Sequence, residues 1–211
     1  MRILLNLGCG GVTPAGWINT DKSWNRVRVG LQRLWTRSRD KGGVRHLELG
    51  RRWPFKSDSV DVVYLSHVLE HLDEQARVHV IREAFRVLKP AGVFRVVVPD
   101  LRGLSEEYLE RSNQGDSQAG RRFLYWLNLH KENLYGRNRS LFKKLYDAVQ
   151  GYPAQHQFMF DRALLESEMS SFDWAVMEFL SYGLSPRVPE IKDVENGKAI
   201  CASLYLEAVK R

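Results

Sequence analysis

A glycine-rich turn near the start of the chain has the composition of a ligand-binding loop. Gly8-Cys9-Gly10-Gly11 follows the apolar run of residues 3–7, which predicts a buried strand of a parallel sheet. Glycines at the carboxyl end of such a strand let backbone amides approach a ligand closely, because no Cβ stands in the way. Open α/β sheets bind ligands at that edge. On these residues alone, a ligand loop and a plain strand-to-loop turn are both open.

A second group, His67-Val-Leu-Glu-His71, fits the His-x-x-Glu-His pattern of an inverted zinc protease motif. Two histidines four positions apart on a helix can bind zinc, with Glu70 as the base. The context argues against this chemistry, because the motif directly follows a buried strand and Asp73, after it, has the type of a helix cap. We therefore predict no metal site and expect His71 to be a packed, hydrogen-bonded histidine.

Asp21 follows a second strand-like run at residues 17–20. In dinucleotide-binding folds, a carboxylate in this place binds ribose hydroxyls and usually lies about 20 residues beyond the glycines. Here it lies only 13 residues beyond Gly8, and the third glycine of the dinucleotide fingerprint falls on Thr13. A nicotinamide cofactor is disfavoured on both grounds.

Alternating strands and helices must position these groups. The predicted strands are residues 3–7, 17–20, 44–47, 60–65, 93–98, 174–180 and 199–206. A helix is predicted over 73–88, ended by the turn 89–92, and another over 158–169. Residues 101–155 contain helical stretches but no strand-like run, which suits a lid beside the carboxyl edge of the sheet. Strand–helix alternation predicts parallel βαβ units.

The positive charge of the chain is concentrated in residues 22–52. Ten basic residues against two acidic ones give this segment +8, whereas the whole chain carries +7. Apolar residues recur at helical spacing within 23–43, so the segment fits a crossover helix with a solvated basic face. It equally fits a contact with anionic partners such as phosphorylated substrates, lipid headgroups or nucleic acid.

The remaining composition bounds the class of protein. No apolar stretch is long enough to span a bilayer, and Met1 leads directly into the first strand without a targeting segment. Cys9 and Cys201 lie in strand-like contexts and are expected to be reduced thiols. We expect a cytoplasmic protein, with the basic segment as a candidate peripheral contact to a membrane.

Eight short stretches together resemble one enzyme family. They are residues 5–10, 16–21, 53–55, 66–72, 85–92, 97–101, 156–161 and 203–208. In this order and at these spacings the chain resembles the class I S-adenosylmethionine-dependent methyltransferases, and is similar to small members that begin directly at the glycine motif. The resemblance implies S-adenosylmethionine as cofactor and S-adenosylhomocysteine as product.

The resemblance also implies the fold. It is an α/β, Rossmann-like three-layer sandwich with a mostly parallel seven-stranded sheet in the order 3-2-1-4-5-7-6. The last strand is antiparallel, and a helical lid over 101–155 follows the fifth strand. Residues 1–211 would form a single domain with the basic crossover at 23–43.

Site residues are carried over position by position. The cofactor-binding set is Leu7, Gly8, Cys9, Gly10, Asp21, Lys22, Glu48, Leu49, Ser66 and His67. Residues 8–10 would pass beneath the methionine part, and Asp21 would hold the ribose hydroxyls. Glu48, where relatives often have Asp, would face the adenine edge with the backbone of Leu49. Residues 66–67 would line the floor beside the sulfonium.

Catalysis needs an acceptor close to the sulfonium methyl and, for a hydroxyl acceptor, a general base. The candidates are His156, His67 and Asp100, with His130 and Tyr152 also expected at the rim. His156 is the first choice, because it opens the block that follows the lid.

The sequence argues against some acceptor classes, and the favoured acceptor rests on association within the family alone. No Asn/Asp-Pro-Pro-aromatic motif follows the fourth strand, and no Pro-Cys nucleophile is placed for carbon methylation of cytosine. Association within the family favours a small-molecule or glycan-like acceptor methylated on oxygen. The alternatives are an RNA or protein methyltransferase that uses segment 22–52, and a non-catalytic cofactor-binding module.

Overall fold

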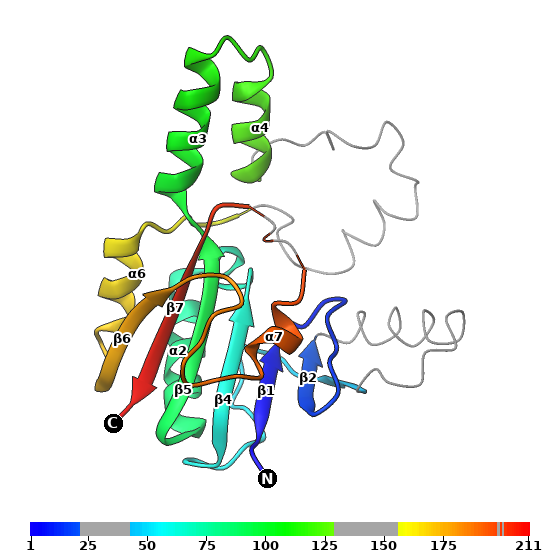
Figure 1. Ribbon diagram of the computed structural model, residues 1–211. Helices are drawn as coiled ribbons and strands as arrows, with labels where there is room; N and C mark the ends of the chain where they lie inside the picture. Colours follow the sequence, from blue (N-terminus) through cyan, green and yellow to red (C-terminus); the bar gives the residue numbers. More distant parts are fainter. Residues whose placement is uncertain (22–42, 129–155, 198, 200) are drawn as a thin grey trace.

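A mixed sheet of seven strands forms the centre of the computed structural model, which describes residues 1–21, 43–128, 156–197, 199 and 201–211 (Figure 1). The strands are β1 Leu4–Leu7, β2 Trp17–Asp21, β3 Val44–His46, β4 Val60–Ser66, β5 Leu88–Pro99, β6 Trp174–Leu180 and β7 Ser203–Lys210. Their order is β3-β2-β1-β4-β5-β7-β6. The first five run parallel, whereas β7 is antiparallel to both β5 and β6. The predicted α/β class, strand order and antiparallel final strand are confirmed.

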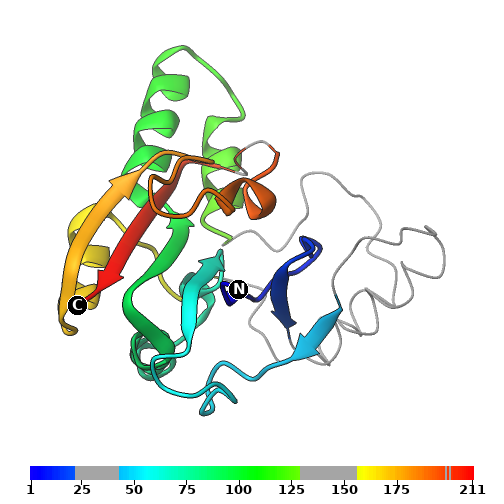
Figure 2. The same ribbon diagram turned by 60° about the horizontal axis from the view of Figure 1, so that its bottom comes forward.

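Helices cover the sheet unequally. The helical elements are η1 Leu69–His71, α2 Glu74–Val87, α3 Leu101–Asn113, α4 Ala119–Trp126, α6 Arg162–Met169 and α7 Ile191–Val194. α2 and α6 lie on one face of the sheet (Figures 1 and 2), where Ile81, Ala84, Leu165 and Met169 are fully buried in the larger core. The cap predicted for α2 is present, because the Asp73 carboxylate accepts a hydrogen bond from the Ala76 amide at 2.8 Å.

The opposite face has a different cover. β1 and β2 are parallel neighbours joined by residues 8–16, which contain no helix. The segment 181–197, which includes α7, packs against this face instead (Figure 1). Val188 and Ile191 are buried there in a second core that includes Trp17 and Tyr64. A short β1–β2 connection therefore leaves apolar strand residues that a distant segment of the chain must cover.

Three element boundaries differ from those expected. The helix predicted over 158–169 begins only at Arg162, because Asp161 caps it by accepting from the Leu164 amide at 2.9 Å. β5 already begins at Leu88, and residues 89–92 interrupt its pairing with β4, because Val60 pairs with Leu88 and Val62 with Val93. β7 begins at Ser203 and runs to Lys210, because its pairing with β5 and β6 continues to that end.

The helices that follow β5 extend beyond the carboxyl ends of the strands (Figure 1). α3 and α4 pack as a hairpin in which the rings of Tyr108 and Phe123 stack at 5.1 Å between centroids. Two helices, α3 and α4, are therefore present where helical stretches were predicted after residue 100, and the second ends at Trp126. The rest of the predicted lid, residues 129–155, and residues 22–42 of the basic segment lie outside the described residues.

Candidate active site

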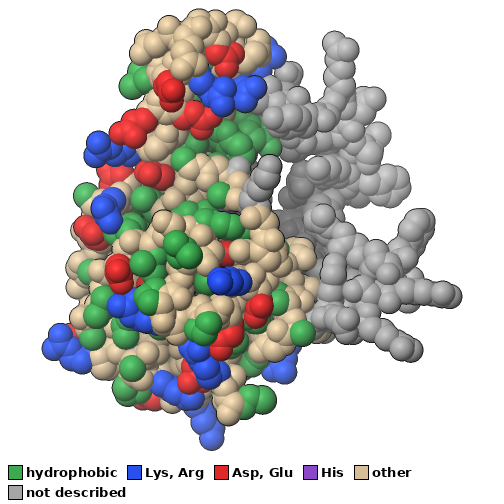
Figure 3. All heavy atoms as spheres, viewed as in Figure 1, with side chains coloured by type: hydrophobic (Ala, Val, Ile, Leu, Met, Phe, Trp, Pro, Cys, Tyr) green, Lys and Arg blue, Asp and Glu red, His purple; other side chains and the backbone are tan. Residues whose placement is uncertain are grey.

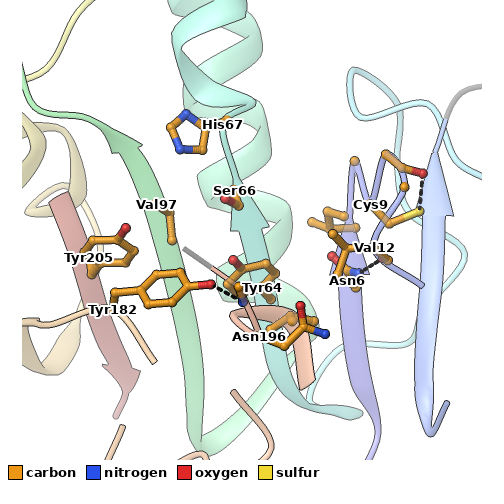
Figure 4. A pocket seen from close by; sticks show the side chains of 16 residues that line it. Asn6, Cys9, Val12, Tyr64, Ser66, His67, Val97, Tyr182, Asn196 and Tyr205 are labelled. Carbon is orange, nitrogen blue, oxygen red and sulfur yellow. Dashed lines mark hydrogen bonds between the residues drawn. The ribbon is translucent and has the colours of Figure 1, made fainter. Parts of the chain in front are cut away.

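A pocket of about 370 Å³ opens at the carboxyl ends of β1 and β4 (Figure 4). Its lining consists of Asn6, Leu7, Gly8, Cys9, Gly10, Gly11, Val12, Tyr64, Ser66, His67, Val97, Tyr182, Val194, Asn196, Gly197 and Tyr205. The volume is within the range typical of small-molecule sites. Six of the predicted cofactor residues are in this lining: Leu7, Gly8, Cys9, Gly10, Ser66 and His67.

The two outer glycines of Gly8-Cys9-Gly10 are needed for different reasons. Both have positive φ, +60° at Gly8 and +52° at Gly10. A Cβ on Gly8 would lie 2.6 Å from Cγ2 of Val68, whereas a Cβ on Gly10 would meet no described atom within 4 Å. Gly8 therefore allows close packing, and Gly10 turns the backbone while leaving open space for a ligand.

Asp21 anchors this loop. Its carboxylate accepts a hydrogen bond from the Gly10 amide at 2.9 Å, and the Cys9 amide donates to the Thr20 carbonyl at 3.0 Å. Asp21 is buried, with 9% of its surface exposed, at the end of β2 beside the pocket. Asp21 is absent from the described pocket lining. Its hydrogen bond to the Gly10 amide holds the glycine loop against β2.

A pair of buried asparagines holds the β1–β2 connection in place. Asn6 donates to the Val12 carbonyl at 2.9 Å and to the Asn19 side chain at 3.0 Å. Asn19 in turn donates to the Pro14 carbonyl at 3.0 Å. Sequence reasoning missed both residues, although a polar side chain inside each of two apolar strands was the available signal.

Glu48 and Leu49 lie outside the pocket lining. The Glu48 carboxylate is partly exposed and pairs with Arg51 at 2.7 Å and with His46 at 3.5 Å. Leu49 is buried, and its carbonyl accepts from Nε1 of Trp53 at 3.3 Å. Lys22, also predicted to bind the cofactor, lies outside the described residues.

His67 occupies the pocket floor in an unusual backbone conformation. Its φ is +52°, a left-handed value that costs a side-chain-bearing residue energy. The backbone is held by donation from the His67 amide to the Val97 carbonyl at 2.9 Å. In the ring, Nδ1 lies 3.2 Å from Oε1 of Glu70, and Nε2 lies 3.5 Å from Oγ of Ser203. A carboxylate thus orients the imidazole from one side.

His156 lies behind this floor and not in the described pocket lining. The amides of Gln157 and Phe158 donate to the Glu70 carbonyl at 2.8 and 3.1 Å, which brings His156 beside η1. The His156 and His71 rings are 4.9 Å apart between centroids. Burial lowers the pKa of His156 to about 4, so the ring is neutral at pH 7.

Asp100 serves as a helix cap. Its carboxylate accepts from the Arg102 amide at 3.0 Å at the start of α3, and its own amide donates to the Ala202 carbonyl at 3.0 Å. It is absent from the described pocket lining. The two remaining candidates, His130 and Tyr152, lie outside the described residues.

The second wall of the pocket comes from segment 181–197 and from β7. Tyr182 and Tyr205 face the glycine loop across the pocket, with Ser66 and His67 between them (Figure 4). The Tyr182 hydroxyl accepts from the Gly197 amide at 2.7 Å, which fixes this wall. No local pattern marks Tyr182 as a site residue, because only the packing of segment 181–197 on the sheet brings it to the pocket.

Charged side chains of both signs are interspersed on the face that carries α7 (Figure 3). Of the basic segment, Arg45, Arg51 and Arg52 are described, and all three are exposed. In the parts of the chain that the structure describes, no helix has the length and apolarity needed to cross a membrane.

Comparisons with known proteins agree on one family. A family model described as a methyltransferase domain matches residues 5–96. No curated protein matches the sequence. A SAM-dependent methyltransferase from Archaeoglobus fulgidus has a TM-score of 0.56 at 13% identity, with 99% of this chain and 86% of that chain covered.

Two further solved structures share the fold. A SAM-dependent methyltransferase from Methanosarcina mazei has a TM-score of 0.51 at 17% identity, over 98% of this chain and 91% of that one. The methyltransferase domain of bacterial CtHen1-C has a TM-score of 0.53 at 17% identity, over 99% and 89% of the two chains.

Proposed function

We propose that this chain acts as a class I S-adenosylmethionine-dependent methyltransferase, with S-adenosylmethionine as its cofactor, and methylates an oxygen atom of a small-molecule or glycan-like acceptor. A methyltransferase-domain family model that matches residues 5–96 supports this proposal. The pocket beside the glycine loop is the proposed site of transfer. The observation that carries this placement is the open space over Gly10, where no described atom lies within 4 Å of an added Cβ.

The proposed binding mode assigns each predicted cofactor residue to one part of S-adenosylmethionine. The backbone of residues 7–10 would hold its methionine part, and Ser66 and His67 would lie beside the sulfonium. Asp21 would accept hydrogen bonds from the ribose hydroxyls while keeping the Gly10 amide in place. Glu48 and the backbone of Leu49 would meet the adenine edge. When bound, the cofactor supplies an activated methyl group, and the protein supplies positioning.

His67 is the better-placed of the two candidate histidines to assist an oxygen acceptor. It lines the pocket, whereas His156 lies behind the floor. The Glu70 carboxylate, 3.2 Å from Nδ1, can fix the ring so that Nε2 accepts a proton from a hydroxyl group. Asp100 is a weaker candidate, because its carboxylate already caps α3.

Two alternative functions remain predictions: methylation of RNA or protein, and cofactor binding without catalysis. An RNA or protein substrate would rely on the basic segment 22–52, of which the described arginines are exposed. A non-catalytic module would bind the cofactor without transferring its methyl group. Salt-dependent association with RNA would favour the first alternative, and cofactor binding without turnover on any acceptor panel would favour the second.

Calorimetry with S-adenosylmethionine and S-adenosylhomocysteine tests the proposed pocket. We expect one site on the full chain, and Gly10→Ala should weaken binding by about tenfold or more because its methyl group enters the ligand space. Gly115→Ala is the matched control, since Gly115 also has positive φ, +77°, and open surroundings but lies after α3. Absence of binding at millimolar cofactor, or equal losses in the two variants, would contradict the proposal.

The acceptor class needs a separate measurement. Transfer of a labelled methyl group from the cofactor to a panel of oligosaccharides and small hydroxylated molecules is expected, with the label stable to conditions that hydrolyse methyl esters. Labelling of RNA or protein, but of none of the small acceptors, would overturn the proposed acceptor while leaving the cofactor site in place.

A further inference from the structure

Three metal-ligating side chains converge behind the pocket floor. Glu70 and His71 lie in η1, and His156 comes from a segment far along the chain. One ligand atom from each residue lies within 4.8 Å of the others, and the described residues contain no other such group of three. We propose that Glu70, His71 and His156 bind a divalent cation of the first transition series.

The backbone builds this cluster. η1 places Glu70 and His71 next to each other, three and four residues after His67. The Glu70 carbonyl then accepts from the amides of Gln157 and Phe158, which are the first two residues after His156. The same residue therefore supplies a side-chain ligand and the backbone anchor for the histidine that comes from afar.

Glu70 carries the strongest indication of a missing partner. Its side chain is fully buried, and Oε1 lies 3.2 Å from Nδ1 of His67. Oε2 has no hydrogen-bond partner among the described residues, and neither has the buried Nδ1 of His156. A buried carboxylate oxygen without a partner is costly. A cation between these atoms would satisfy both at once.

The donor set indicates the class of metal. Two imidazoles and one carboxylate suit zinc, cobalt, iron or manganese better than the all-oxygen ligation that calcium and magnesium prefer. Ligands at about 2.1 Å from one ion lie roughly 3.3–4.2 Å apart, so small side-chain rotations would close the described cluster. Three protein ligands leave a coordination position open, as in catalytic metal sites.

The site also connects to the pocket. His67 lines the pocket and contacts the Glu70 carboxylate, so it would be an outer partner of the metal. This placement revises the expectation, drawn from the strand and helix context alone, that the His-x-x-Glu-His motif holds no metal. That expectation rested on the buried strand before the motif and the cap at Asp73 after it, whereas the third proposed ligand, His156, comes from a segment far along the chain.

Cobalt titration of the chelator-treated full chain tests the site. We expect one Co²⁺ per chain, visible absorption bands of imidazole-ligated cobalt, and displacement of the cobalt by Zn²⁺. Glu70→Gln, His71→Asn and His156→Gln should each weaken binding by about tenfold or more, while circular dichroism verifies that each variant is folded. His79→Gln is the matched control, because it removes an imidazole that lies on α2, outside the cluster, with its Nε2 at 3.0 Å from the Arg51 carbonyl.

Two results would overturn the site. The first is the absence of Co²⁺ and Zn²⁺ binding to the wild-type chain at millimolar metal, which needs no variant to be folded. The second is one-to-one binding that all three ligand variants leave unchanged, which would mark an adventitious surface ion. Calorimetry with S-adenosylmethionine on the same metal-free sample separates these failures from a failure of the cofactor pocket.

Discussion

The Arg95 guanidinium and the Glu195 carboxylate form a buried bidentate ion pair, with both nitrogen–oxygen distances at 3.0 Å. Arg95 lies in the middle of β5, and Glu195 directly follows α7, so the pair fastens the wall segment 181–197 to the sheet. Glu195 also accepts from the Gly183 amide at 2.6 Å. Asn196 and Gly197, the next two residues, line the pocket. The Arg95–Glu195 ion pair, which lies outside the pocket, therefore helps to hold the pocket wall formed by segment 181–197.

Replacing the arginine should destabilise the protein and loosen this wall. Arg95→Met removes the arginine that pairs with two buried carboxylates, Glu195 at 3.0 Å and Glu207 at 3.7 Å, so we expect a loss of about 3–5 kcal/mol in the free energy of unfolding. Urea denaturation measures the loss. The double variant Arg95→Met/Glu195→Leu should recover part of it, because one of the two buried carboxylates that lose Arg95 is removed. A single variant as stable as the wild type would show that the pair is not buried as described.

The close packing of Gly8 against Val68 predicts that a side chain at position 8 destabilises the protein and that a smaller residue at position 68 reduces this loss. Gly8→Ala places a Cβ 2.6 Å from Cγ2 of Val68 in a backbone with φ of +60°. We expect a loss of about 1–3 kcal/mol in stability from the strained backbone and further loss from the clash. Adding Val68→Ala should relieve the clash alone, so the Gly8→Ala penalty measured in that background should be smaller. Thermal or urea unfolding of the wild type, the two single variants and the double variant measures the two Gly8→Ala penalties.

Much of the sheet could be predicted because its signals are local. The apolar runs of β1, β2, β4 and β6 are bounded by turn residues, and each strand lies within one residue of its predicted range. The cap at Asp73 was visible for the same reason. The strand order came from the resemblance to a family, since no local pattern tells which strands are neighbours.

The parts that escaped prediction depend on contacts between distant residues. The wall residues Tyr182 and Asn196 lie in segment 181–197, which is held over β4 and β5 by its buried apolar residues and by the ion pair of Arg95. His156 could be named as a candidate, but its position behind the floor follows from the bonds of its neighbours to Glu70. The left-handed backbone of His67 also has no sequence signal, because glycine is the residue that normally marks such a conformation.

Asp21 offers a test that separates anchoring from ligand binding. Asp21→Ala removes the acceptor of the Gly10 amide and the proposed ribose contacts, so S-adenosylmethionine should bind more weakly by about 1–3 kcal/mol. Asp21→Asn keeps an oxygen that can accept from Gly10, so the loop should stay anchored. Calorimetry gives the affinities and thermal unfolding gives the stabilities. Unchanged affinity in Asp21→Ala would remove this residue from the proposed cofactor site.

The thiol of Cys9, in the middle of the glycine loop, should be unreactive in the folded chain. Burial, followed by the nearby Asp21 carboxylate, raises the pKa of Cys9 to about 12. Since the thiolate is the reactive form, only about one molecule in ten thousand would be reactive at pH 8. Alkylation with iodoacetamide, followed by mass spectrometry, should label Cys9 in urea but hardly in the native protein.

The same shift predicts how stability changes with alkaline pH. A thiol whose pKa is higher in the folded chain keeps its proton there, whereas the unfolded chain begins to release it near the ordinary cysteine pKa of about 8.5. The contribution of Cys9 to stability is therefore full below that pH and falls as the pH rises towards about 12. Cys9→Ala should lose less stability between pH 8 and pH 10 than the wild type does. Rapid native labelling of Cys9, or the same pH dependence in the variant, would contradict the buried, protonated thiol.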